Sequence, residues 1–369
     1  MKIGIITLNG LFNYGNRLQN YALKEYIKQL SDDIIVDNIW WGKKFELNDQ
    51  SIYNFQNIRR FIVNRHNFRE KIGEKFFVDK IKEYNFKKFN DKYINTVYCS
   101  SIKEEIEYKY DFFIAGSDQI WNPYWIENNG YNELLLFTEP QKRIAYAASM
   151  GVDRIPDNSK ELYSKAFSEM DKISVREHAG ADIVKELTGK EVPVLVDPTM
   201  LLSKKQWISI SEKPYWLQKG KYILIIYLGE IPDFVKIYIS NVAEKYKLKV
   251  INLMNKSNWE QYVTGPEGFL YLMEHAELVM TDSFHATVFS IIMQTPFFNW
   301  SRKGAMGMNM DTRIDTLLGL FGYNDRKINE NTLEKINNPF EIDFENSVRV
   351  LGIEQNKSRK FLLSAIGRK

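Results

Sequence analysis

Short apolar runs alternate with amphipathic stretches along the first half of the chain. Residues 2–8 form the first apolar run, and apolar positions at helical spacing follow from 17 to 30. The alternation continues with strand-like runs at residues 34–37, 110–115 and 143–149 and a further helical segment at 159–170. Buried strands that alternate with helices predict an α/β domain with a parallel sheet.

The same alternation begins again after a break near residues 200–215, where prolines and a lysine-rich segment interrupt regular structure. The predicted strands of the second half lie at residues 222–228, 249–253, 278–280 and 297–300. The predicted helices between and after them lie at residues 232–246, 266–275, 286–293 and 312–318. We therefore predict two Rossmann-like domains that face a cleft, at residues 1–200 and 215–343. One interpretation of the last helix, within residues 344–369, is that it crosses back to the first domain.

A polar cluster stands between a buried strand and a buried helix in the second half. The apolar run 278–280 ends at Thr281, Asp282 and Ser283, and His285 precedes the next apolar segment. Ligands of open α/β sheets bind at the carboxyl ends of strands, so His285 occupies a strong candidate position. The pattern is equally compatible with a histidine that only packs in the core.

The strand ends of the first half also carry polar residues. Asn16 closes a loop rich in glycine and asparagine, and Ser117, Asp118 and Gln119 follow the strand at 110–115. Arg176 follows a short strand, and its guanidinium suits a carboxylate or a phosphate. The alternatives are an ordinary strand–helix turn at Asn16 and an arginine paired with a neighbouring glutamate.

Charge and composition exclude several function classes. The 369 residues carry a formal net charge of +3, which gives no case for nucleic acid as the main partner. With one cysteine and four histidines, neither a disulfide framework nor a zinc or other metal site is expected. No apolar run approaches the roughly 20 residues that span a bilayer, so we expect a soluble cytoplasmic protein.

Residues 43–109 predict a helical insertion in the first domain. This segment holds 15 Lys and Arg against 10 Asp and Glu, interleaved with Phe, Tyr and Ile. A basic, aromatic helix of this kind can rest on an anionic membrane, which would give peripheral contact with its inner face. The alternative is a solvated helix face that packs on the domain.

Five short motifs in a fixed order resemble the polysaccharide pyruvyl transferase family. They are Gly15-Asn16-Arg17-Leu18-Gln19-Asn20-Tyr21-Ala22-Leu23, Gly116-Ser117-Asp118-Gln119-Ile120-Trp121-Asn122-Pro123, Ser174-Val175-Arg176-Glu177, Val196-Asp197-Pro198-Thr199-Met200-Leu201-Leu202 and Thr281-Asp282-Ser283-Phe284-His285-Ala286-Thr287. The resemblance extends over about residues 1–320, and its strength lies in the order of the motifs rather than in any one of them.

The resemblance implies a fold like that of the GT-B glycosyltransferases. It also implies transfer of the pyruvyl group of phosphoenolpyruvate, without a further cofactor, onto a sugar of a bacterial surface polysaccharide or its lipid-linked precursor, which forms a ketal. The family's histidine and basic residues correspond to His285 and, less closely, to Arg176 and Lys303. Many members have Arg-Leu before the histidine, where this chain has Ser283-Phe284, so the donor contact comes from elsewhere or the donor differs.

Residue chemistry then suggests a role for each candidate. His285 would act as acid and base, and Asp118 would position or deprotonate the sugar hydroxyl. Donor contacts are predicted for Arg176, Ser283, Lys303, Arg313, Asn16 and Arg17, and further substrate contacts for Ser117, Gln119 and Asp282. Two other functions remain open on the sequence: a GT-B glycosyltransferase that uses a nucleotide sugar, and a non-catalytic protein that binds carbohydrate or phosphate.

Overall fold

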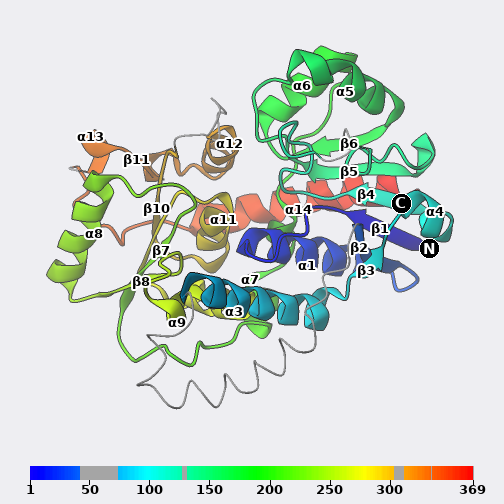
Figure 1. Cartoon of the computed structure of the whole chain (residues 1–369). Coiled ribbons are helices and arrows are strands. Elements are labelled where there is room, and N and C mark those ends of the chain that lie inside the picture. Colours follow the sequence, from blue (N-terminus) through cyan, green and yellow to red (C-terminus); the bar gives the residue numbers. More distant parts are fainter. Residues whose placement is uncertain (42–73, 127–130, 303–310, 334, 369) are drawn as a thin grey trace.

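Two parallel sheets form the framework of the molecule (Figure 1). The computed structural model describes residues 1–41, 74–126, 131–302, 311–333 and 335–368. The first sheet has the order β3-β2-β1-β4-β5-β6, with strands Lys2–Ile6 (β1), Ile35–Trp41 (β2), Val97–Cys99 (β3), Phe112–Ala115 (β4), Arg143–Ala148 (β5) and Lys172–Val175 (β6). The second has the order β11-β10-β9-β7-β8, with strands Tyr222–Ile226 (β7), Lys249–Asn252 (β8), Leu278–Thr281 (β9), Phe297–Trp300 (β10) and Lys327–Ile328 (β11).

The prediction of an α/β fold with two Rossmann-like, GT-B-like lobes is confirmed by these two sheets and their connecting helices. The first lobe carries α1 (Tyr14–Lys28), α3 (Glu74–Phe89), α4 (Ile102–Glu105), α5 (Asp157–Glu169) and α6 (His178–Thr188). The second carries α8 (Asp233–Tyr246), α9 (Trp259–Tyr262), α10 (Pro266–His275), α11 (Phe284–Met293), α12 (Thr312–Phe321) and α13 (Glu330–Leu333). A 3-10 turn, η5 (Pro198–Leu201), and the short helix α7 (Lys204–Ser209) join the two lobes.

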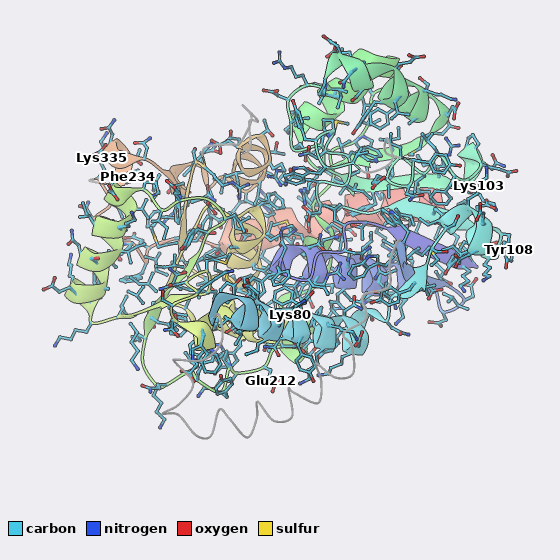
Figure 2. The ribbon with its side chains drawn as sticks, in the orientation of Figure 1. Lys80, Lys103, Tyr108, Glu212, Phe234 and Lys335 are labelled. Carbon is cyan, nitrogen blue, oxygen red and sulfur yellow. The ribbon has the colours of Figure 1, made fainter. Side chains whose placement is uncertain are left out.

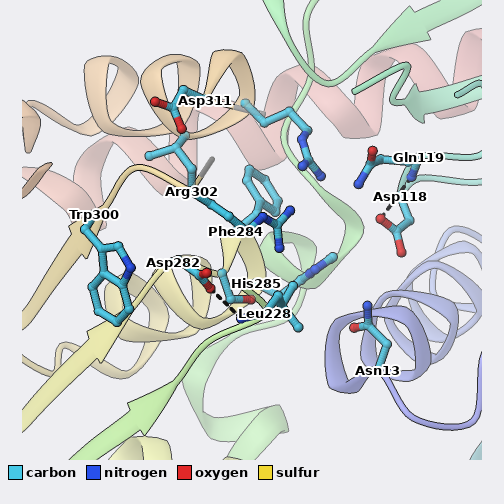
Figure 3. Close-up of a pocket in the computed structure, with 13 residues that line it drawn as sticks. Asn13, Asp118, Gln119, Leu228, Asp282, Phe284, His285, Trp300, Arg302 and Asp311 are labelled. Carbon is cyan, nitrogen blue, oxygen red and sulfur yellow. Dashed lines mark hydrogen bonds between the residues drawn. The ribbon is translucent and has the colours of Figure 1, made fainter. Parts of the chain in front are cut away.

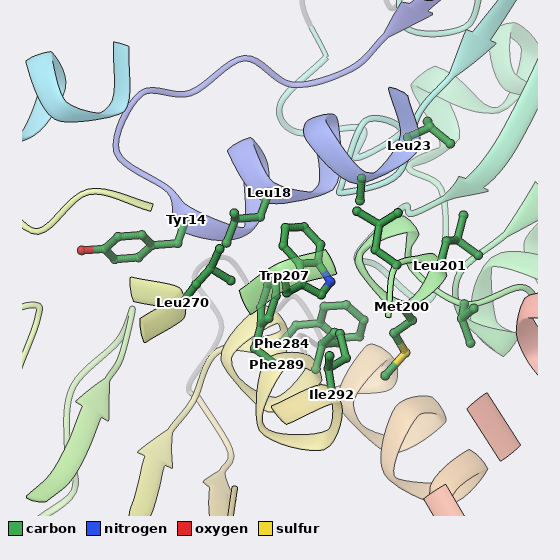
Figure 4. Close-up of a cluster of buried hydrophobic side chains, with 14 of the residues drawn as sticks. Tyr14, Leu18, Leu23, Met200, Leu201, Trp207, Leu270, Phe284, Phe289 and Ile292 are labelled. Atoms are coloured by element: carbon green, nitrogen blue, oxygen red, sulfur yellow. The ribbon is translucent and has the colours of Figure 1, made fainter. Parts of the chain in front are cut away.

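The two lobes share one hydrophobic core, so they are packed against each other rather than separated by solvent. Tyr14 and Leu18 of α1 meet Trp207 of α7 and Phe289 of α11 in this cluster (Figure 4). The Tyr14 ring also stacks on Phe269 of α10, with centroids 4.6 Å apart. Side chains fill most of the space between the ribbons of the two lobes (Figure 2).

The structure changes the interpretation of the segment predicted as a helical insertion. Within its described part, Val97–Cys99 is a strand that extends the first sheet beside β2, so the insertion is not wholly helical. Helix α3 packs on the second lobe, where Asp79 accepts a hydrogen bond from the Tyr262 hydroxyl at 2.7 Å and pairs with Lys256. Residues 43–73 of the predicted membrane-contacting region lie outside the described residues. In the described part of the chain, no helix is long and apolar enough to cross a bilayer.

The last helix, α14 (Glu345–Ala365), returns to the first lobe (Figure 1). Gln355 donates to the Met200 carbonyl at 2.8 Å and its own carbonyl accepts from the Tyr26 hydroxyl. Farther along, Lys172 of β6 donates to the Ala365 carbonyl at 2.7 Å. The chain therefore ends on the lobe in which it begins.

Candidate active site

A small cavity lies between the two lobes at the carboxyl ends of the strands (Figure 3). Its volume is about 40 Å³. The first lobe contributes residues after β1 and β4, and the second contributes residues after β7, β9 and β10 together with the start of α12. The lining residues are Asn13, Asp118, Gln119, Leu228, Asp282, Ser283, Phe284, His285, Trp300, Arg302, Asp311, Arg313 and Ile314. This is the place where two facing α/β sheets converge on a ligand.

His285 stands in the first turn of α11 and faces this cavity, not a remote part of the core. The turn forms because Ser283 caps the helix, its hydroxyl accepting from the Ala286 amide at 3.5 Å. The histidine is 7% exposed. Its ring packs against Gly15 in the first turn of α1, where a β-carbon would lie 2.0 Å from Nδ1. The second lobe thus presents its histidine directly to the first.

The other ring nitrogen of His285 faces a buried carboxylate. Nε2 lies 3.5 Å from Oδ2 of Asp197, which is longer than a well-formed hydrogen bond and describes an electrostatic contact. Burial by itself would raise the pKa of Asp197. Together, His285, Arg176 and the amide of Thr199 hold that pKa well below its usual range. Asp197 is therefore an anion at neutral pH.

Asp118 reaches the cavity through an unusual backbone conformation. Its φ is +65°, in the left-handed region that non-glycine residues seldom adopt. The carboxylate accepts from the Asn16 side-chain amide at 3.3 Å and from the Gln119 backbone amide at 2.9 Å. Strain of this kind persists where neighbours fix it, and it keeps the Asp118 carboxylate at the edge of the first lobe.

Two guanidinium groups line the second lobe's side of the cavity. Burial, together with the nearby charge of Arg176, lowers the pKa of Arg313 to about 10, so it stays cationic at neutral pH. When the Gln119 side-chain amide is oriented with its nitrogen toward Asn122, its oxygen lies 2.9 Å from Arg313 Nη1 and accepts a hydrogen bond from it. Arg302 lies over Gly229, where a β-carbon would be 2.6 Å from the arginine Cγ. The cavity can therefore attract an anion.

Asp282 also lines the cavity, but both of its oxygens are engaged. They accept from the backbone amides of Leu228 and Gly229 at 2.7 and 2.8 Å, which ties the loop after β7 to the end of β9. Burial raises the pKa of this carboxyl, and the two amides oppose the shift. Asp282 shapes the cavity wall.

Arg176 and Ser117 lie behind the cavity wall and are not among its lining residues. Arg176 Nη1 donates to Asp197 at 2.6 Å, and its guanidinium covers the Phe284 ring with its carbon 4.4 Å from the centroid. Ser117 donates to the same Asp197 oxygen at 2.9 Å. The arginine's main partner is thus Asp197 and not the adjacent Glu177, which lies 3.9 Å away.

Arg17 is not brought to the cavity. Its side chain is fully buried in the first lobe and donates to Asn90, Asn9, Asn16 and the Leu8 carbonyl at 2.9 to 3.1 Å. Burial lowers its pKa to about 9. The geometry does not support the predicted donor contact for Arg17, because it does not line the cavity and both of its terminal nitrogens donate within the lobe. Asn16 is also buried there, and it reaches the site only through Asp118.

Part of this group of residues was predicted from the sequence. The structure brings His285, Asp118, Gln119, Asp282, Ser283 and Arg313 to one cavity. Lys303 lies outside the described residues. The lining residues outside the predicted set are Asn13, Leu228, Phe284, Trp300, Arg302, Asp311 and Ile314. Asp197 was also given no role, although it stands in one of the five motifs and its position before Pro198 suggests a cap.

Metal ligation has no support in the described residues, where no group of three His, Cys, Asp or Glu side chains is arranged to hold an ion. Any charge stabilisation at this cavity by the described residues would come from arginine and histidine side chains and backbone amides.

Comparison with solved structures returns sugar-nucleotide enzymes at low identity. UDP-GlcNAc 2-epimerase from Neisseria meningitidis bound to UDP-GlcNAc is 12% identical, with 99% of this chain and 100% of that chain covered and a TM-score of 0.44. A putative UDP-N-acetylglucosamine 2-epimerase from Listeria monocytogenes is 9% identical, covers 99% and 90%, and has a TM-score of 0.47. An E. coli heptosyltransferase with ADP-2-deoxy-2-fluoro heptose is 12% identical, covers 84% and 91%, and has a TM-score of 0.36.

Comparison at the sequence level identifies the family of the protein. A search of curated proteins finds no significant match. The family described as polysaccharide pyruvyl transferase matches residues 13–302, which include Asn13 at the start of the cavity lining and Arg302 near its end. The match covers most of the chain, and so the protein belongs to the polysaccharide pyruvyl transferase family.

Proposed function

We propose that this protein transfers the pyruvyl group of phosphoenolpyruvate onto a sugar of a bacterial surface polysaccharide, or onto its lipid-linked precursor, and releases phosphate. The observation that carries the proposal is His285 in an interlobe cavity with Arg302 and Arg313, in a chain of this family. An imidazole and two cations suit a small phosphorylated acid better than a neutral ligand. No further cofactor is part of the proposal.

The reaction begins with a proton delivered to the methylene carbon of the donor. The central carbon becomes electrophilic, and a first sugar hydroxyl adds to it and loses its proton. A second hydroxyl of the same sugar then displaces phosphate, and its proton leaves with the released phosphate, which closes the ketal. His285 supplies the first proton and recovers one from a hydroxyl, an exchange that suits an imidazole near neutral pH.

Arg302 and Arg313 hold the donor's phosphate and carboxylate. They supply the positive charge that Ser283 does not, because this chain has a serine where many relatives have an arginine. Arg176 acts behind them through Asp197, and Asp118 receives the sugar from the first lobe. In this arrangement the arginines that bind the donor lie on the second lobe, and the aspartate that contacts the acceptor sugar lies on the first lobe.

Ligand-dependent melting and product analysis test the proposal. Phosphoenolpyruvate is expected to raise the melting temperature, and more so than nucleotide sugars. With pyranose acceptors supplied free and lipid-linked, phosphate release should accompany a carboxyethylidene group on the acceptor. A melting shift caused by nucleotide sugars alone would favour glycosyl transfer. Saturable binding of donor and acceptors without phosphate release would favour a non-catalytic binding protein.

A further inference from the structure

Asp197 is placed at the junction of the two lobes. It lies in the linker just before η5, its side chain is fully buried, and it caps that turn. Oδ1 accepts from the Thr199 amide at 3.0 Å and from the Thr199 hydroxyl at 2.7 Å. These contacts fix one carboxylate oxygen to the linker and leave the other to face the site.

The second oxygen collects contacts from both lobes. From the first lobe, Oδ2 accepts from Arg176 at 2.6 Å and from Ser117 at 2.9 Å. From the second lobe, His285 Nε2 approaches it to 3.5 Å. A carboxylate held on three sides by short hydrogen bonds has little freedom to rotate, so it presents a fixed negative charge to the imidazole.

The two nitrogens of His285 therefore lie in different surroundings. Nε2 faces the Asp197 carboxylate, and Nδ1 faces Gly15 and the first turn of α1. An imidazole nitrogen directed at a carboxylate is favoured to carry the proton, which fixes the tautomer of the neutral ring. The other nitrogen then has the lone pair.

We infer that Asp197 is a positioning residue that keeps the proton of neutral His285 on Nε2, so that Nδ1 keeps the lone pair and is the ring nitrogen able to take up a further proton. This inference rests on the proposed function for the identity of the substrates, but the tautomer does not depend on it. Asp197 itself takes up no proton. It stabilises the imidazolium that forms when Nδ1 is protonated, and its contact with Nε2 shortens in that state.

Nuclear magnetic resonance of the full-length protein tests the tautomer directly. The chain has four histidines, so ¹⁵N imidazole signals are few, and the spectrum of His285→Gln assigns those of His285. The native protein at a pH where the ring is neutral is expected to show a protonated Nε2 and an unprotonated Nδ1. Protonation at Nδ1 in the native protein would overturn the inference, whatever reaction the protein performs.

The variant Asp197→Asn tests whether the carboxylate sets the tautomer of His285 and thereby the rate. It is expected to give mixed or inverted tautomer signals, and kcat for pyruvyl transfer should fall by about 10²-fold or more with KM little changed. The matched control is Ser117→Ala, which removes a hydrogen bond to the same oxygen without touching the imidazole. That control should keep the native tautomer and most of the kcat.

A purely structural role for Asp197 gives a different result. In that case Asp197→Asn would lower stability as much as Ser117→Ala or more, while the His285 signals stayed those of the native tautomer. This outcome would overturn the inference. If the asparagine variant does not fold, the native spectrum still decides. If no pyruvyl transfer is found at all, the proposed function fails while the tautomer measurement remains readable.

Discussion

The turn between β1 and α1 and the turn between β9 and α11 are built alike but are used differently. Each follows a buried parallel strand and begins a helix with a side-chain cap, Asn13 in one and Ser283 in the other. Each also places a basic side chain in the first turn, Arg17 or His285. Arg17 is enclosed by partners of its own lobe, whereas His285 faces the other lobe across a cavity.

The difference shows that a polar helix start is not by itself a ligand site. The Arg17 donors are satisfied by Asn9 and Asn16 beside them and by Asn90 on a π-helical turn that follows α3. A buried guanidinium whose two terminal nitrogens already donate within the protein has little left to offer a ligand. His285, in contrast, makes no short hydrogen bond through Nε2, and its ring lies between the Asp197 carboxylate at 3.5 Å and Gly15.

The largest expected effect comes from His285→Gln, which keeps the polarity and approximate size of the side chain. Loss of an acid and base step should lower kcat for pyruvyl transfer by about 10²–10⁴-fold. The melting temperature should change little, since the imidazole makes no short hydrogen bond. Initial rates of phosphate release at saturating donor and acceptor measure this. A kcat within tenfold of the native value would remove His285 from the mechanism.

Arg17→Met should show the reverse pattern. Four acceptors would each lose one charged donor, and the free energy of unfolding should fall by about 3 kcal/mol. Denaturant unfolding measures this, and kcat of the folded fraction should stay near the native value. Arg17→Lys, which keeps the charge but not the planar fork, should recover only part of the stability. A large loss of kcat with unchanged stability would place Arg17 in the site after all.

Gly15→Ala tests the point where the two turns meet. The added β-carbon would lie 2.0 Å from His285 Nδ1, so either the ring or the lobes must shift. A displacement of about 1 Å at a reacting group can cost on the order of 10²-fold in rate. Gly10→Ala is the matched control, because an added β-carbon there meets no atom within 4 Å. Equal activity in the two variants would mean that the ring contact has no role in catalysis.

Lys82→Met extends the comparison to a second buried cation beside α1. The Lys82 ammonium lies 4.1 Å from the Tyr262 ring centre and 5.1 Å from that of Tyr14, and burial lowers its pKa to about 7. The unfolded chain, with a lysine pKa near 10.4, binds the proton more tightly, so native stability should rise from pH 7 to pH 9.

The rise should be at most about 1.4 kcal/mol per pH unit, and Lys82→Met should lack it. Unfolding midpoints at several pH values measure the difference between the two proteins. Lys80→Met, on the same helix with its side chain 37% exposed, is the control and should retain the native slope. A parallel pH dependence in native protein and Lys82→Met would contradict the lowered pKa.

Much of the fold followed from the hydrophobic pattern. The helix at Pro266–His275 and the strand at Phe297–Trp300 have the predicted bounds, and most other strands differ by one or a few residues at an end. Two strands were not predicted, Val97–Cys99 and Lys327–Ile328, because so few residues give no visible alternation. Helix α1 begins at Tyr14 and not at Arg17, since the cap is Asn13 inside the asparagine-rich loop.

The candidate site was predictable only in outline. Strand ends pointed to Asp118 and His285, which do meet at the cavity. The roles of Arg17 and Arg176 could not be predicted from the sequence, because their partners Asn90 and Asp197 are 73 and 21 residues away in the chain. Asp197 itself resembles an ordinary cap in the sequence, and only the spatial contacts of its second oxygen show that it faces His285.

The sequence by itself determined the order of strands and helices, the two parallel sheets and the family, because these depend on local periodicity and on motifs in a fixed order. Only the tertiary structure decided which polar side chains are satisfied within the protein and which remain for a ligand. The physical reason is that hydrogen bonds and burial depend on neighbours in space. The contacts of His285 with Gly15 and Asp197 join segments that no local pattern connects.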